Sequence, residues 1–106
     1  MDINQVMQQA QLFQKRMADI QEELAGQQIT STVGGGMVTV TVNGKNDLLG
    51  ITIDREIINP EDPGLLQDLI VAGVNDAMRK AREAMQGEMR KLTGGLNIPG
   101  LSGMFG

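Results

Sequence analysis

The sequence predicts an α+β fold in which a long helix, a three-stranded antiparallel meander and a second long helix follow one another. Two stretches carry apolar residues at helical spacing, and the stretch between them alternates apolar and polar residues with the period of strands. Short segments rich in Gly and Asn separate the alternating runs, and loops this short join antiparallel neighbours. The 106 residues are expected to form a single domain.

The first predicted helix is amphipathic and ends near Gly26, a typical stop signal. Its apolar residues are separated by alternating steps of three and four, which is a heptad pattern. They are Ile3, Val6, Ala10, Phe13, Met17, Ile20 and Leu24. The residues between them have good helix propensity.

Three strands are predicted between residues 28 and 54. Their alternating positions are Ile29, Ser31 and Val33, then Val38, Val40 and Val42, then Leu49, Ile51 and Ile53. β-branched residues at every second position indicate strands with one buried face. The breaks at residues 34–36 and 43–47 have hairpin-turn chemistry. The three glycines lead into a strand rather than a helix, which excludes a phosphate-binding P-loop.

The second predicted helix begins with Asp62 as its N-cap and Pro63 as its first residue, and extends to about Leu92. Its apolar positions are Leu66, Ile70, Val71, Val74, Ala77, Met78, Ala81, Met85 and Leu92. The Thr-Gly-Gly sequence that follows should end it. We therefore expect one helix–sheet–helix domain over residues 1–93 and a flexible Gly-rich tail over residues 94–106.

The length of this helix predicts a homodimer. A helix of about 30 residues is roughly 45 Å long, whereas a compact domain of this size is only about 35 Å across. Three short strands make a patch roughly 20 Å long and 10–15 Å wide. Such a patch cannot cover both helices, so a second copy is the simplest source of the missing contacts.

The composition excludes most catalytic chemistry. The chain has no His, Cys, Trp or Tyr, which removes the common nucleophile–base pairs and the side chains of zinc, haem and iron–sulfur sites. We expect no enzymatic activity, cofactor, metal or small-molecule substrate. The sequence has no signal-peptide pattern and no membrane-spanning run, so we expect a cytoplasmic protein with no membrane partner.

Binding to nucleic acid would require a local basic surface, because the net charge is −4. In the second helix, Asp76 and Lys80, Arg79 and Glu83, and Glu88 and Lys91 have the spacing of ion pairs. Arg82 and Arg90 have no acidic residue three or four positions away, and they share a stripe with Arg79 and Gln86. This stripe could contact phosphates, or it could be a solvated flank whose arginine stems cover the edge of the core.

Four segments also form a recognisable set in their order and spacing. They are Glu22-Glu23-Leu24 in the Gln- and Met-rich first helix, residues 34–40 with Asn43-Gly44, residues 51–54, and residues 66–77. Together with the tail, they make the chain resemble the YbaB/EbfC family of bacterial nucleoid-associated proteins. The resemblance implies a tweezer-like homodimer whose helices project from a central sheet. It also implies DNA binding without enzymatic activity, in the nucleoid, with a role in its organisation or in expression.

The sequence therefore predicts a homodimer that binds duplex DNA through phosphate contacts. Arg82 and Arg90 should contribute most, with support from Arg79, Lys80, Lys91, Lys15 and Arg16. The alternative is a protein–protein adaptor whose helices hold a partner and whose charges only provide solubility. Steep salt dependence of DNA binding distinguishes the two hypotheses.

Overall fold

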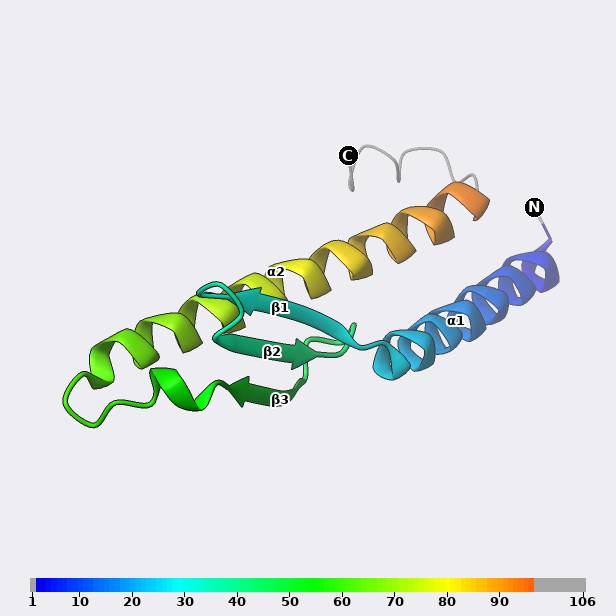
Figure 1. The fold of residues 1–106 in the computed structure, drawn as a ribbon. Coiled ribbons are helices and arrows are strands. Elements are labelled where there is room, and N and C mark those ends of the chain that lie inside the picture. The colour runs from blue at the N-terminus through cyan, green and yellow to red at the C-terminus, as the bar shows by residue number, and fades with distance from the viewer. Residues whose placement is uncertain (1, 97–106) are drawn as a thin grey trace.

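The computed structural model describes residues 2–96, and it has the predicted helix–sheet–helix order (Figure 1). Its elements are α1 (Ile3–Gly26), β1 (Ile29–Val33), β2 (Val38–Val42), β3 (Leu48–Ile53), the short 3-10 helix η1 (Arg55–Ile57) and α2 (Pro63–Leu96). The strands form one antiparallel sheet in the order β1-β2-β3. The predicted α+β fold class is confirmed. The helical turn η1 was not predicted.

Hydrogen bonds cap both ends of α1. The Asp2 carboxylate accepts a hydrogen bond from the Asn4 backbone N–H at 3.1 Å, which caps the start of the helix. After Gly26 the chain becomes extended, and the Gln27 N–H donates to the Leu24 carbonyl at 3.2 Å. The predicted end of this helix is confirmed.

Helix α2 begins at Pro63 as predicted but ends at Leu96 rather than near Leu92. The Thr-Gly-Gly sequence that was expected to end the helix continues it, and the Thr93 hydroxyl donates to the Met89 carbonyl of the preceding turn at 3.0 Å. Glycine disfavours a helix interior by only about 1 kcal/mol, so it does not forbid one further turn. Of the predicted tail, residues 97–106 lie outside the described residues.

The turn between β2 and β3 anchors the end of α1. The Asn43 Oδ1 atom accepts from the backbone N–H groups of Lys45 and Asp47, both at 3.0 Å. The Gly44 N–H donates to the Leu24 carbonyl at 2.8 Å. A Cβ atom on Gly44 would lie 2.9 Å from that carbonyl oxygen, so only glycine fits here. The turn thereby fixes the position where α1 leaves the sheet.

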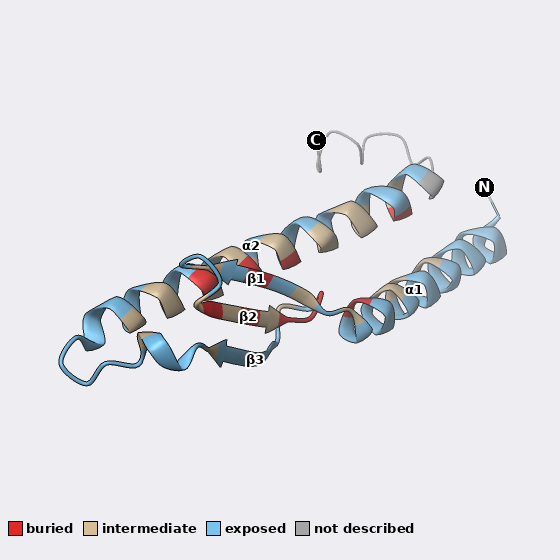
Figure 2. Cartoon of the chain, in the orientation of Figure 1, coloured by how far each residue is buried: buried red, intermediate tan, exposed pale blue. Residues whose placement is uncertain are grey.

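Helix α2 covers β1 and β2 and leaves β3 uncovered (Figure 2). The core consists of Val38, Val40 and Val42 of β2 against Ala77 and Ala81 of α2, all fully buried. Small helix residues allow this close approach. In β3, by contrast, Ile51 and Leu48 pair with Val40 and Val42 but are 37% and 49% exposed. Directly paired residues share a face of the sheet, so the apolar face of β3 lies beside the core without a cover.

The molecule is elongated, with extents of 69 × 25 × 16 Å and a radius of gyration of 19.5 Å. A compact domain of this length would have a radius of gyration of about 13 Å. The difference arises because α1 and the C-terminal half of α2 extend beyond the sheet in the same direction (Figure 1). Many apolar side chains on α1 are exposed, including Ile3, Val6 and Met7. No helix within residues 2–96 is both long and apolar enough to span a membrane.

Two glycines of α2 should respond oppositely to replacement by alanine. A Cβ atom on Gly73 would lie 2.8 Å from Cγ2 of the buried Val40, whereas one on Gly87 meets nothing within 4 Å. Overpacking a core destabilises the fold by about 1–3 kcal/mol, whereas replacing a glycine inside a helix by alanine stabilises it by about 1 kcal/mol. We expect Gly87→Ala to raise the free energy of unfolding by about 0.5–1 kcal/mol and Gly73→Ala to lower it. Urea denaturation measures both, and stabilisation by Gly73→Ala would contradict the described packing.

Candidate nucleic-acid interface

The outer face of α2, opposite the sheet, carries exposed polar and basic residues. Ala77 and Ala81 define the inner face, because they are buried against the sheet. At about 100° per residue, Arg82, Gln86 and Arg90 lie on the opposite side, and all are exposed. We call these three residues the outer stripe. Arg82 and Arg90 are separated by roughly 12 Å along the helix axis.

Neither arginine of the outer stripe is neutralised by a carboxylate in the described part of the chain. The ion pairs found within residues 2–96 involve only Arg79, Lys80 and Lys91 among the basic residues. The prediction from spacing, that Arg82 and Arg90 have no local acidic partner, therefore agrees with the geometry. Gln86 and Arg90 also line a shallow hollow of about 290 Å³ together with Met85 and Met89.

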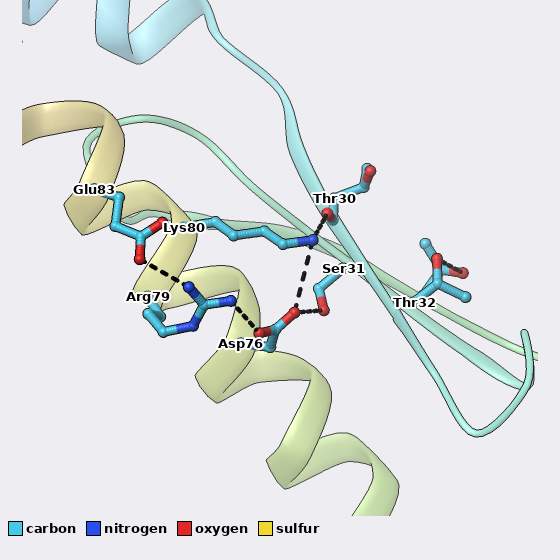
Figure 3. A network of polar contacts seen from close by, with 8 residues as sticks. Thr30, Ser31, Thr32, Asp76, Arg79, Lys80 and Glu83 are labelled. Atoms are coloured by element: carbon cyan, nitrogen blue, oxygen red, sulfur yellow. Dashed lines mark hydrogen bonds and ion pairs between the residues drawn. The ribbon is translucent and has the colours of Figure 1, made fainter. Parts of the chain in front are cut away.

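The other basic residues of α2 are held by carboxylates, as their spacing predicted. Arg79 contacts Glu83 at 2.8 Å, Lys80 contacts Asp76 at 3.6 Å and Lys91 contacts Glu88 at 3.5 Å. A further ion pair, between Arg79 and Asp76 at 2.8 Å, was not predicted (Figure 3). Arg79 thus contacts two carboxylates at once.

Asp76 connects this group to the sheet. The hydroxyl of the buried Ser31, in β1, donates to Asp76 Oδ2 at 2.5 Å. This hydrogen bond, followed by that from Arg79, lowers the pKa of Asp76 from 3.8 to about 2. The two carboxylates in turn raise the pKa of Arg79. Sequence reasoning missed Ser31, although a hydroxyl at an inward strand position needs a buried partner and could have signalled one.

The candidates on α1 lie apart from the outer stripe. Arg16 lines a hollow of about 280 Å³ between the two helices, where Lys91 of α2 lies as well. Asp19, Glu23 and Glu88 also line this hollow, so these two cations have acidic neighbours. Lys15 is exposed on α1. The seven predicted residues therefore do not form one surface. Lys15 and Arg16 of α1 and Arg82 and Arg90 of α2 are exposed without an ion pair among the described residues, but only Arg82 and Arg90 of these four lie on the outer face of α2.

Comparison with known proteins gives consistent results. The family model described as the YbaB/EbfC DNA-binding family matches residues 1–96. A nucleoid-associated protein of Clostridium acetobutylicum is 51% identical over 94% of this chain and 89% of its own length. One from Syntrophobacter fumaroxidans is 52% identical over 93% and 92%, respectively. The crystal structure of an uncharacterized protein from Helicobacter pylori matches with a TM-score of 0.80 at 26% identity, covering 87% of this chain and 97% of that one.

The lowered pKa of Asp76 predicts a loss of stability in acid. The folded protein favours the charged form of this carboxylate, so the charge stabilises the fold at pH values above 3.8. This stabilisation is lost as the pH falls to about 2. Asp76→Asn keeps an oxygen acceptor for Ser31 but removes the titration. We expect the wild type to lose more stability than this variant between about pH 5 and pH 2.

Asp68→Asn is the matched control, because Asp68 is an exposed carboxylate of the same helix without an ion pair among the described residues. It should follow the wild type in thermal denaturation across the same pH range. Equal acid sensitivity of the wild type and Asp76→Asn would contradict the role assigned to this carboxylate.

Proposed function

The chain belongs to the YbaB/EbfC DNA-binding family, and on this premise we propose that it is a non-enzymatic, nucleoid-associated protein that binds duplex DNA as a homodimer. Two relatives, each about half identical in sequence, carry the name nucleoid-associated protein, which supports association with the nucleoid. The proposal includes a role in nucleoid organisation and gene regulation. The observation that carries the proposal is the pair of exposed, unpaired arginines on the outer face of α2, within the described residues.

The outer stripe has the chemistry of a phosphate-binding surface. Arginine presents a planar fork of donors that matches phosphate oxygens in a bidentate way. The roughly 12 Å between Arg82 and Arg90 corresponds to about three or four nucleotides of one strand, at 3.4 Å per step. The outer stripe contains no aromatic residue, which disfavours base stacking. Contacts of this kind position a protein on duplex DNA and carry little sequence information.

The uncovered apolar surface supports assembly into a homodimer. Asp76 and Lys80 reach β1 from one flank of α2, so the opposite flank, which carries Val71, lies on the β3 side. Val71 is 59% exposed, and Leu48 and Ile51 of β3 are exposed as well. We call the β3 side of α2 and the apolar face of β3 the lateral surface. In a two-fold dimer each copy would cover the lateral surface of the other.

A dimer would also double the binding surface. The outer stripe is displaced from Val71, because Arg90 lies about 100° away around α2 and Arg82, on nearly the same side as Val71, lies roughly 16 Å farther along the axis. A dimer contact centred on Val71 would therefore leave the arginines accessible. Two copies related by a two-fold axis present twice the number of unpaired guanidinium groups to one duplex. The net charge of −4 per chain doubles as well, so binding would depend on the local concentration of these arginines and not on net charge.

A charge on the lateral surface should dissociate the dimer. Val71→Glu places a carboxylate where the partner would pack, and glutamate keeps good helix propensity. We expect analytical ultracentrifugation at micromolar concentration to give twice the chain mass for the wild type and the single chain mass for this variant. The control is Ala72→Glu, an exposed neighbour that points away from the lateral surface. A wild-type monomer, or dissociation by both variants, would contradict this arrangement.

Loss of the outer stripe should weaken DNA binding. We expect Arg82→Ala combined with Arg90→Ala to reduce affinity for random and genomic duplexes at least about tenfold, or roughly 1.4 kcal/mol. Each lost phosphate contact should also lower the salt slope by about one. Gel-shift titrations at several salt concentrations measure both. Arg79→Ala should have a smaller effect, because Asp76 and Glu83 already offset that charge.

A charge-matched control comes from outside the predicted site. Lys45→Ala combined with Arg55→Ala removes the same charge from two other exposed positions and should leave binding nearly unchanged. Equal weakening by the two double variants would show that only net charge matters. If the wild type shows no salt-sensitive DNA binding, the protein–protein adaptor replaces the DNA-binding proposal.

A further inference from the structure

Asp76 lies where the sheet meets the basic part of α2, and three donors converge on its carboxylate (Figure 3). Ser31 donates to Oδ2 at 2.5 Å, Arg79 Nη2 donates to Oδ1 at 2.8 Å, and Lys80 Nζ lies 3.6 Å from Oδ2. Because Ser31 is 1% exposed and belongs to β1, its hydroxyl holds the carboxylate in place. Asp76 therefore cannot follow either cation away from the protein surface.

Each of the two cations has a second partner within the protein. The Nη1 atom of Arg79 donates to Glu83 Oε1 at 2.8 Å, so both arms of the guanidinium fork are occupied. Lys80 Nζ donates to the Thr30 carbonyl at 3.2 Å, which holds the ammonium against the free edge of β1. Both side chains are thus turned toward carboxylate or carbonyl oxygens of the chain itself.

Arg79 would otherwise extend the outer stripe. It lies three residues before Arg82 on the same side of the helix, about 4.5 Å along the axis. A phosphate that approaches Arg79 must compete with two carboxylates for the same donors, and it is repelled by their charge. Exposed ion pairs are weak, so this competition lowers the contribution of Arg79 and Lys80 without abolishing it.

We propose that Asp76 is a positioning residue that limits DNA affinity by holding Arg79 and Lys80 to the protein, an inference that rests on the proposed DNA-binding function. The fixed carboxylate acts as an internal substitute for a phosphate. Its removal leaves Lys80 free of any ion pair found in the described residues and Arg79 with Glu83 alone.

Asp76→Asn tests the inference, because the amide oxygen still accepts from Ser31 while the negative charge is gone. We expect affinity for random duplex DNA to rise at least about threefold, and the salt slope to become steeper by about one per released phosphate contact. Asp68→Asn changes the net charge equally on the same helix, and it should give a clearly smaller gain.

The dependence on the two cations provides a second test. In an Arg79→Ala, Lys80→Ala background, the gain from Asp76→Asn should fall to that of Asp68→Asn. Without any change at Asp76, this double variant should lose less than the roughly tenfold expected for removal of Arg82 and Arg90. This comparison uses exposed or half-exposed side chains, so it holds even if Asp76→Asn proves unstable by circular dichroism.

The outcomes separate the inference from the proposed function. If the wild type binds DNA and Asp76→Asn gains no more than Asp68→Asn, the positioning role is overturned while DNA binding stands. A tenfold loss on removing Arg79 and Lys80 alone would also overturn it, because the two cations would then be fully engaged. Absence of salt-sensitive binding by the wild type and every variant overturns the proposed function and, with it, the inference.

Discussion

The structure depends on a difference in length: α2 has 34 residues and is much longer than the two short strands that it covers. The core forms where the valines of β2 meet the small residues of α2, and the helix contributes to it only between Leu66 and Ala81. Helix α1 and the C-terminal half of α2 extend beyond the sheet, and the apolar face of β3 stays uncovered. The elongated shape, the exposed face of β3 and the expected dimer all follow from this limited contact.

Residues of different chemical character lie on different sides of helix α2. Alanines face the sheet, one flank bonds to β1 through Asp76 and Lys80, the other flank is apolar, and the outer side carries Arg82 and Arg90. An acidic chain can offer a basic surface in this way, because unpaired cations are concentrated on one side of one element. The carboxylates nearby then set how many of the basic residues are available to an external anion.

Local sequence patterns predicted most of the fold. The alternation around Val40 indicated a buried strand face, and Asp62-Pro63 indicated the start of α2. Alternation shows that a face is apolar but not what covers it, so the exposure of β3 could not be predicted. Ion pairs one helical turn apart were visible from spacing, whereas the bond between Ser31 and Asp76 joins residues far apart in the sequence and depends on the tertiary fold.

On the proposed arrangement, the outer face of α2 contacts DNA while the lateral surface serves assembly. Titration of isotope-labelled protein with a random duplex, followed by NMR, distinguishes the two surfaces. We expect the side-chain N–H signals of Arg82 and Arg90 and the amide signal of Gln86 to shift in a salt-sensitive way, and the signals from β3 to stay in place. Shifts concentrated in β3, or confined to α1, would show that DNA binds elsewhere on the protein.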